Sequence, residues 1–407
     1  MWTRGTLIGT QMPTTGSGII SDTLWMNAAR VRGYLWVFAV VNVATLLYLW
    51  GTSSGGVDRN GFLVGSDFLS FWAAGQMVAH GTDVYDTVAH ITAQREFYTQ
   101  GDSYVAFFYP PPFLLLCYPL SFLPYFWALA CWIASTGTVY LTVISRWLTR
   151  YKITTSRWLL AAAFPPVLIT ITHGQTSFLV GALLGLGALL VRNRPGTAGV
   201  CFGLAVIKPQ FGVLVPLVLL LTGEWRVIVS ASATALSFGL AASAAFGLSI
   251  WAHWLKAAGA AQAALGDGTV GFGKMQSSFA AAMLLGAPVG IAQAIQVSVA
   301  LAVICAICWV SWRKRYSLSL GAAMLAGAPL VTPFILDYDL VILAFPLIWL
   351  VGQGLGAREA IIAAATFTAA TFSRPLALTV GLPVMPFVLA VFFGLLIRKT
   401  MGEKLSS

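Results

Sequence analysis

Residues 34–50 read YLWVFAVVNVATLLYLW, an uncharged and almost wholly apolar run. Similar runs recur to the end of the chain, at 105–122, 124–145, 158–172, 177–191, 197–207, 211–221, 227–247, 288–312, 318–331, 340–351, 360–372 and 382–397. A bilayer is crossed by a helix of about 20 apolar residues. Across all 407 residues, 58% are hydrophobic and 9% are charged, whereas soluble domains are roughly 25% charged. The sequence therefore predicts an all-α, polytopic transmembrane helical protein and excludes an ordinary soluble enzyme.

Charge placement predicts the topology. Basic residues gather at alternate ends of the apolar runs, and the positive-inside rule then places the amino terminus in the cytoplasm. We expect about 12 crossings plus one re-entrant segment at 105–122, where four prolines interrupt the run. The expected parts are a cytoplasmic tail at 1–33, a single transmembrane domain at 34–397 with outward loops at 51–104 and 248–278, and a second cytoplasmic tail at 398–407.

The formal net charge of +10 does not indicate a nucleic-acid partner. The basic residues are scattered at the ends of the apolar runs and form no patch with interleaved aromatic residues. The pair Cys305 and Cys308 lies on an apolar run and lacks a second pair of ligands, so we interpret it as helix packing.

Several apolar runs are too short to cross a bilayer and meet at polar turns, notably 173–176 and 208–210. Helices of roughly 11 to 15 residues cover only about 16 to 23 Å. Such turns then lie at membrane depth inside the protein, where they line a cavity, because lipid-exposed irregular backbone is not tolerated there. The expected topology directs both turns, the Asp67 loop, the Lys274 loop and the 332–339 turn to the non-cytoplasmic side.

The same segments carry a family resemblance. The chain has GSDFLSFWAAG at 65–75 and VYD at 84–86, then FYPPP at 108–112, GQ at 174–175, KPQ at 208–210, GKMQS at 273–277 and TPFILDYD at 332–339. In this order they resemble the motifs of glycosyltransferase family 87, polyprenol-phosphate-mannose-dependent mannosyltransferase-like proteins of the C-type membrane superfamily. The last motif carries Tyr338 and Asp339 where mannosyl-transferring members tend to carry a histidine.

The resemblance implies a C-type glycosyltransferase-like fold and a hexosyltransferase. It implies transfer of a hexose, with mannose favoured, from a polyprenyl-phosphate donor to a lipid or glycan acceptor, with inversion. The protein would be multi-pass in the cytoplasmic (inner) membrane, surrounded by membrane lipids, with its active site on the outer face. Nucleotide sugars are absent there, and the chain shows no Gly-rich phosphate loop, which also favours a lipid-linked donor.

Asp67 is the predicted catalytic base. A carboxylate in the first outward loop, at the start of a helical stretch with Phe68, Phe71 and Trp72, suits removal of the acceptor hydroxyl proton. The alternative is that Asp67 caps the following helix. We expect two short amphipathic helices in this loop, at 67–79 and 84–98, along the membrane surface.

Lys208 and Lys274 are the predicted ligands of the donor phosphate. A lysine between two apolar half-helices is costly in a membrane, and its point charge suits a phosphate oxygen. Lys208 has two alternatives, snorkelling to the interface or a structural pair with a carboxylate such as Asp337. Arg95 is a further cation of the first loop, and loop charges are commonly only solvated.

The predicted sugar or acceptor contacts combine flat apolar faces with polar groups; they are Trp72, Tyr85, Tyr109, Gln175, Gln210, Asp337, Tyr338 and Asp339. Aromatic belts at membrane interfaces predict the same aromatic residues. His173, next to Gln175, is either a supporting group or structural. Asp337 and Asp339 could hold a divalent metal, but contacts to the acceptor or to lysine are favoured, so no cofactor and no metal is expected.

Two other classes of function compete with the enzyme. A transporter or flippase of a lipid-linked or anionic substrate would also have broken helices and intramembrane polar residues, but it usually shows two similar halves, which are not evident here. A lipid-binding scaffold without chemistry would tolerate replacement of Asp67.

Overall fold

The structure is a computed structural model that describes residues 27–59, 61–98, 105–266, 268 and 271–403. The described residues form helices and isolated bridges, with no strand among them. Six helices are long and apolar enough to cross a membrane: α1 (Ala28–Gly51), α5 (Tyr125–Arg150), α11 (Trp225–Phe246), α14 (Val289–Arg313), α17 (Ala357–Val380) and α18 (Met385–Gly402). This confirms the all-helical, multi-pass prediction, and the total of about 12 crossings stays a prediction.

Shorter helices fill the space between the long ones. They are α6 (Arg157–Ala163), α7 (Pro165–His173), α8 (Ser177–Leu190), α9 (Pro195–Leu204), α10 (Leu214–Thr222), α13 (Ser278–Leu284), α15 (Leu318–Val331) and α16 (Ala344–Gly352), with the 3-10 turns η2 (Ala205–Ile207), η3 (Pro209–Phe211) and η5 (Asp337–Leu343). The run expected at 158–172 is split at Phe164, whose backbone is extended. Pro165 and Pro166 follow it, and a residue before proline is disfavoured in the helical region.

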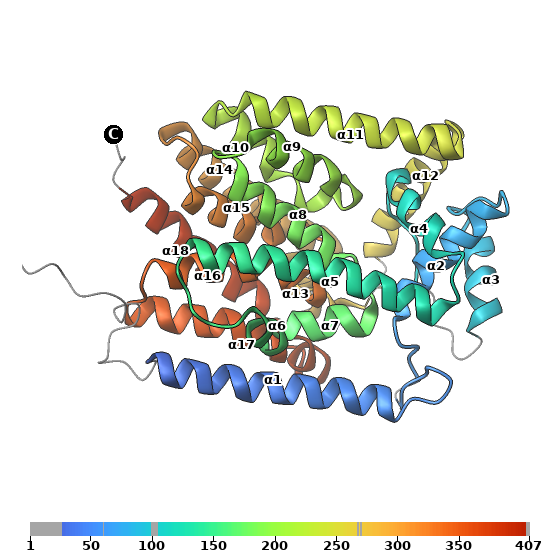
Figure 1. Ribbon diagram of the computed structural model, residues 1–407, viewed down its shortest axis with the longest axis horizontal. Coiled ribbons are helices and arrows are strands. Elements are labelled where there is room, and N and C mark those ends of the chain that lie inside the picture. The colour runs from blue at the N-terminus through green and yellow to red at the C-terminus, as the bar shows by residue number, and fades with distance from the viewer. Residues whose placement is uncertain (1–26, 60, 99–104, 267, 269–270, 404–407) are drawn as a thin grey trace, which may run out of the picture.

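One end of the molecule is built from helices of the two expected loops and of the proline-rich segment 105–122. α2 (Ser66–Ala79), α3 (Thr87–Phe97), α4 (Leu114–Leu120, continuing η1, Pro111–Phe113) and α12 (Ser249–Gly266) gather at one end of the longest axis (Figure 1). The two short helices expected in the first loop are therefore present. The second loop, expected at 248–278, is largely the helix α12, followed by η4 (Phe272–Lys274).

One polar contact joins the two loops, and a second joins α12 to the proline turn. The imidazole of His253 in α12 lies 2.9 Å from the Asp83 carboxylate, and the Trp254 indole donates to the carbonyl of Phe108 at 3.1 Å. α12 is thereby fixed against the first loop and the proline turn.

Basic residues lie at the opposite end of the molecule. α1 begins there with Arg30 and Arg32 in its first turns, and α5 and α18 end there (Figure 1). Arg192 pairs with Glu224 at 2.9 Å, and Lys314 donates to three carbonyls at the end of α18. This clustering agrees with the charge pattern of the sequence. The expected tail at 1–33 lies mostly outside the described residues, as does part of 398–407.

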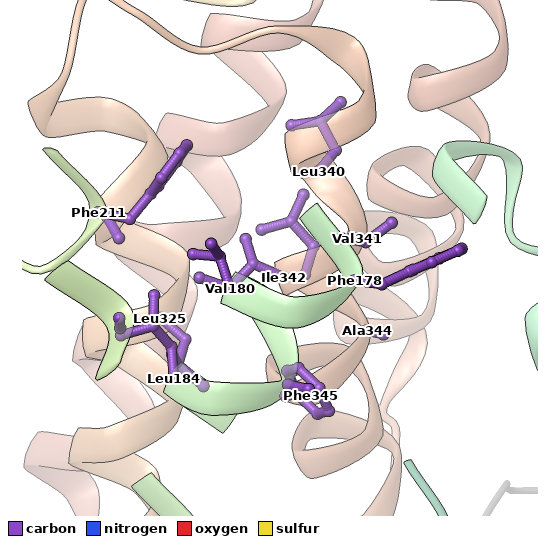
Figure 2. Packing of buried hydrophobic residues seen from close by; sticks show 14 of the residues in the cluster. Phe178, Val180, Leu184, Phe211, Leu325, Leu340, Val341, Ile342, Ala344 and Phe345 are labelled. Carbon is purple, nitrogen blue, oxygen red and sulfur yellow. The ribbon is translucent and has the colours of Figure 1, made fainter. Parts of the chain in front are cut away.

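The buried centre consists of α8, α15, α16 and η5 (Figure 2). Phe178 and Leu184 of α8 pack with Val341 of η5 and Phe345 of α16, all of them buried. The Tyr140 hydroxyl donates to the Val341 carbonyl at 2.7 Å. Side-chain packing and this hydrogen bond hold η5, which carries the last sequence motif, in one position.

Candidate active site

Two glycines bring the start of α2 against the turn between α7 and α8. Gly65 (φ +76°) donates its N–H to the Thr172 carbonyl at 2.9 Å. Gly174 ends α7 with φ +67°, and a Cβ there would lie 2.6 Å from the Cβ of Phe68. Only glycine tolerates both this backbone conformation and this close approach. The contact sets Asp67, the second residue of α2, beside Gln175.

Gln175 binds the Asp67 carboxylate directly. Its side-chain N–H group donates to Asp67 Oδ2 at 2.7 Å and also to the Tyr338 hydroxyl at 3.1 Å. Its carbonyl oxygen accepts from the Tyr109 hydroxyl at 2.9 Å and from the Thr176 N–H at 3.0 Å. Because the Thr176 N–H can bind only the carbonyl oxygen of the Gln175 amide, the NH2 group of that amide faces Asp67. Gln175 therefore presents a donor to the carboxylate.

Asp67 does not cap its helix. The N-cap position is Gly65, and the described hydrogen bonds to the carboxylate come from the side chains of Gln175 and Ser66. Asp67 is half-buried. Its carboxylate is thus held in place while part of the residue stays accessible.

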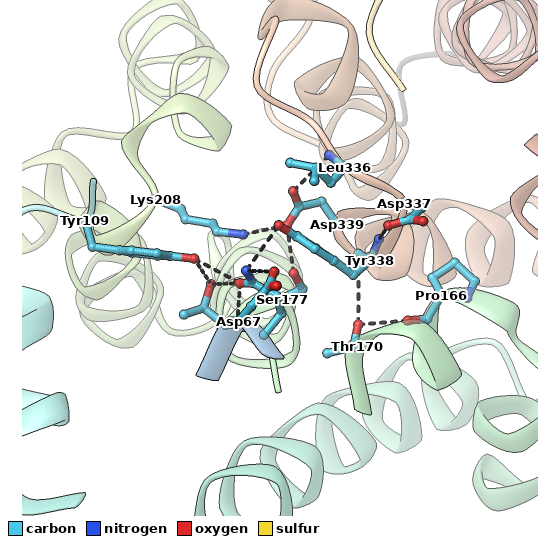
Figure 3. A network of polar contacts seen from close by, with 12 residues as sticks. Asp67, Tyr109, Pro166, Thr170, Ser177, Lys208, Leu336, Asp337, Tyr338 and Asp339 are labelled. Atoms are coloured by element: carbon cyan, nitrogen blue, oxygen red, sulfur yellow. Dashed lines mark hydrogen bonds and ion pairs between the residues drawn. The ribbon is translucent and has the colours of Figure 1, made fainter. Parts of the chain in front are cut away.

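Lys208 lies behind this group, in a buried ion pair. Its ammonium is 2.7 Å from Asp339 Oδ1, which also accepts from the Ser177 hydroxyl at 2.7 Å (Figure 3). The same ammonium lies 5.2 Å from the ring centre of Tyr338 and 5.9 Å from that of Tyr109. Lys208 therefore has the structural carboxylate partner that the sequence left open, but the partner is Asp339 and not Asp337.

Asp337 binds a different cation, Arg374. Its Oδ2 accepts from the Arg374 guanidinium at 3.1 Å, and its Oδ1 accepts from the N–H of Tyr338 at 3.0 Å. Arg374 was missed by the sequence analysis because the apolar run was taken to end at Phe372, whereas α17 continues to Val380. An arginine within a helix of membrane length could have indicated a functional position from the sequence alone.

The motif at 273–277 reaches the same place through backbone pairing. Met275 and Leu336 form an isolated antiparallel bridge, and the Gln276 N–H donates to the Ile335 carbonyl at 2.9 Å. Lys274 is half-buried, with its ammonium 6.0 Å from the ring centre of Phe62. Lys274 therefore lies between the first loop and the segment that carries Asp337.

The remaining predicted residues lie around the network or away from it. The Trp72 indole donates to the Leu123 carbonyl at 2.9 Å, and the Tyr85 hydroxyl donates to the Tyr109 carbonyl at 2.8 Å. Both polar tips thus bind backbone, and Tyr85 holds Tyr109. Gln210 is partly exposed in η3, and Arg95 is exposed on α3.

His173 stands between the two aspartate segments. Its Nδ1 lies 2.9 Å from the Ile169 carbonyl, one turn back in α7, and its ring centre is 5.8 Å from that of Tyr338. A ring nitrogen that donates to a carbonyl leaves the other nitrogen as an acceptor in the neutral imidazole. His173 is a half-buried ring at the edge of the network.

The carboxylates differ in their partners. Asp339 is bound by Lys208 and Asp337 by Arg374, whereas Asp67 is bound by an amide and a hydroxyl. Within the described ranges no group of three or more His, Cys, Asp or Glu side chains is arranged to hold a metal ion. The absence of a metal requirement stays a prediction.

Long apolar helices around a half-buried carboxylate, with a buried lysine close by, define a multi-pass membrane protein with a polar site for chemistry. The family model of glycosyltransferase family 87 matches residues 107–333, more than half of the chain. The chain belongs to this family, as its motifs indicated, and is a membrane glycosyltransferase. Tyr109, Gln175, Lys208 and Lys274 lie inside the matched region, and Asp67 lies outside it. No curated protein and no solved structure matches the chain.

Proposed function

We propose that the protein transfers a hexose from a polyprenyl-phosphate donor to a hydroxyl group of a lipid or glycan acceptor, with Asp67 as general base. The observation that carries the proposal is the partner of Asp67. Of the three carboxylates in the network, it alone has no cation partner among the described residues, and it is half-buried. A carboxylate that is not paired with a cation can receive a hydrogen bond from the acceptor hydroxyl.

The proposed reaction is a single displacement. The acceptor hydroxyl oxygen attacks the anomeric carbon, and the bond to the phosphate oxygen breaks with its electron pair leaving on the polyprenyl phosphate. Asp67 takes the hydroxyl proton, so no charge is left on the acceptor. A single displacement inverts the anomeric centre, and Gln175 keeps the carboxylate oriented throughout.

A lipid-linked donor suits a site enclosed by membrane helices. The polar network lies where α2 begins, α7 ends and α8 begins, next to η5 and α17. A polyprenyl chain would stay in the bilayer while its phosphate and sugar enter this network. Mannose is the proposed sugar, and this choice is based on the family resemblance alone.

The substrate contacts are proposed by position. Gln175 binds Asp67, and Tyr109 and Tyr338 bind Gln175, so these three side chains are the proposed contacts for sugar or acceptor hydroxyls. Of the two lysines predicted for the donor phosphate, Lys274 keeps that proposed role, whereas Lys208 is already bound to Asp339. The other predicted contacts act from further out or hold neighbouring side chains in place; they are Trp72, Tyr85, Gln210, Asp337 and Asp339.

A transfer assay with three donors tests the proposal. Purified protein in vesicles is given radiolabelled polyprenyl-phosphate mannose, polyprenyl-phosphate glucose or a nucleotide sugar, together with a membrane lipid extract as acceptor. We expect a new glycosidic product from a lipid-linked donor only. Activity with the nucleotide sugar alone would overturn the proposal, and so would entry of label into the vesicles without a new bond, which is the result of a transporter.

The proposed location is the cytoplasmic (inner) membrane, with the Asp67 network open to the outer face. Val88 on α3 is exposed and Arg194 lies at the basic end, so single cysteines there report the two sides. The natural cysteines, of which Cys131 and Cys305 are exposed, are first replaced by alanine. We expect Val88→Cys to be labelled from outside by an impermeant maleimide and Arg194→Cys to be protected; the reverse pattern would invert the topology.

A further inference from the structure

Arg374 is a cation that the proposed reaction does not yet use. It lies inside the long apolar helix α17, its side chain is 25% exposed, and one of its nitrogens binds the Asp337 carboxylate, which is 1% exposed. A charge in a helix of membrane length is expensive and marks a functional position by default.

The geometry of this ion pair leaves most of the guanidinium donors available. Among the described residues, Arg374 forms one side-chain hydrogen bond, from Nη1 to Asp337 Oδ2 at 3.1 Å. A guanidinium has five N–H donors in a planar fork, and this fork matches the oxygens of a phosphate. Asp337 accordingly binds one nitrogen of the Arg374 guanidinium. The other N–H donors of this partly exposed side chain can bind an anion.

A second cation lies on the element packed against Arg374. Gly273 of η4 lies so close to α17 that a Cβ there would be 2.5 Å from a methyl carbon of Leu378. Leu378 follows Arg374 by four residues, so the two share one face of the helix. Lys274 is the next residue of η4, and the following backbone pairs with Ile335 and Leu336, directly before Asp337.

Lys208 is less suited to meet a phosphate. Its side chain is 7% exposed, and its ammonium is bound to Asp339 at 2.7 Å behind the rings of Tyr109 and Tyr338. Arg374 has more than three times that exposure and a longer contact to its carboxylate.

From this we infer that Arg374, together with Lys274, binds the phosphate of the lipid-linked donor, and that Asp337 is the positioning residue for Arg374. The inference rests on the proposed function. Lys208 then stabilises the network from behind, and the sugar extends from the phosphate past Tyr338 and His173 towards Asp67.

The probes are farnesyl phosphate and farnesol, which differ only in the phosphate group. Neither carries a sugar, so the test does not depend on which sugar the protein transfers. Binding to the purified full chain is measured for wild type, for Asp337→Asn and for the double variant Arg374→Gln with Asp337→Asn. The double variant avoids leaving Asp337 buried without a partner. Arg192→Gln with Glu224→Gln removes an ion pair at the opposite end and is the matched control.

We expect wild type and the Arg192 control to bind farnesyl phosphate at least about tenfold more tightly than farnesol, as one charge-assisted contact allows. The Arg374 double variant should lose this preference. Asp337→Asn, which keeps the guanidinium, should retain most of it. A folded Arg374 double variant with an undiminished preference for the phosphate would overturn the inference.

The transfer assay separates this inference from the proposed function. An Arg374-dependent preference for farnesyl phosphate in a protein that forms no glycosidic bond would support the phosphate site and refute the transferase step. Transfer from a lipid donor by the Arg374 double variant, at the wild-type KM for that donor, would leave the proposed function in place and refute the phosphate site.

Discussion

Gln175 and Asp67, 108 residues apart in the sequence, are joined by a hydrogen bond of 2.7 Å from the amide of Gln175 to the carboxylate of Asp67. The same amide binds Tyr109 and Tyr338. One side chain therefore couples the first loop, the proline turn and the last motif. The orientation of the proposed base depends on this amide more than on any group of its own helix.

Replacement of Gln175 by leucine should slow the chemical step. The variant keeps a side chain of similar length but removes the donor to Asp67, and misplacement of a reacting group by about 1 Å costs up to about 100-fold in rate. We expect kcat to fall about 10- to 100-fold with the donor KM little changed. Steady-state kinetics with a lipid donor measures both constants.

Gln353→Leu is the control for that variant, since Gln353 is exposed beyond the end of α16. It should behave as wild type. Equal kinetics in Gln175→Leu and wild type would show that the amide does not position the base.

Gly174→Ala should disturb the same contact through the backbone. Gly174 has φ +67°, and an added Cβ would lie 2.6 Å from Phe68 and 2.8 Å from Leu129. The left-handed conformation alone costs an alanine about 1 to 2 kcal/mol. We expect a lower thermal stability and reduced turnover. Gly259→Ala in α12, where a Cβ meets nothing within 4 Å, should leave both unchanged.

The Lys208 and Asp339 pair should respond more strongly to single than to double replacement. Removing one partner of a buried ion pair leaves an uncompensated charge and typically costs about 3 to 5 kcal/mol, whereas replacing both is often neutral. We expect Lys208→Met and Asp339→Leu each to lower the melting temperature in detergent, and the combined variant to recover most of the loss. A combined loss equal to the sum of the single losses would contradict the pairing.

Acid should loosen the packing of α3. Burial lowers the pKa of His90, whose Nδ1 lies 2.9 Å from the Val84 carbonyl. An unfolded histidine titrates near about 6.5. Below that pH the unfolded chain binds a proton that folded His90 still excludes, so stability falls from about pH 6.5 down to the lowered pKa.

Limited proteolysis of the first loop between pH 8 and pH 5 measures this effect. Wild type should become more susceptible as the pH falls below about 6.5. His90→Gln, which has no titratable ring, should show a flatter dependence. The same acid sensitivity in both proteins would assign it to another group.

The proximity of the polar motifs could be predicted because polar turns between short apolar helices have few places to lie. Asp67, Tyr109, Gln175 and Lys208 lie close together in the structure, which agrees with the expectation that such turns face the interior of the protein. Their roles in binding and catalysis stay predictions. The two short helices of the first loop were also evident, because apolar residues recur there at helical spacing.

The pairing of the last motif could not be predicted. Asp337 and Asp339 are two residues apart, and side chains at this spacing point in different directions in a 3-10 turn and in an α-helix alike. The structure directs Asp339 to Lys208 and Asp337 to Arg374. A sequence shows that two carboxylates are close, but the packing of α17 and of the turn at Lys208 around η5 decides which cation each one meets.

Two helix limits were misjudged for physical reasons. α17 continues through Pro375, which is tolerated in membrane helices because neighbouring groups satisfy the freed backbone. The expected loop 248–278 contains the alanine-rich helix α12, and alanine has the highest helix propensity.

The predicted sugar contacts of Trp72 and Tyr85 could not be decided from the sequence. The indole N–H of Trp72 and the hydroxyl of Tyr85 donate to backbone carbonyls, which amphipathic aromatic side chains do as readily as they contact sugars.

Sugar transfer by Asp67→Asn is the most direct test of the proposed mechanism. Asparagine keeps the size of the side chain but cannot take up the acceptor proton, and Asp86→Asn is the matched control because asparagine also caps α3. With radiolabelled polyprenyl-phosphate mannose and equal amounts of inserted protein, we predict that Asp86→Asn transfers sugar as wild type does. Asp67→Asn should bind farnesyl phosphate normally and lose at least about 100-fold in turnover, the contribution of a general base. Wild-type turnover in Asp67→Asn would contradict the role of Asp67 as the base.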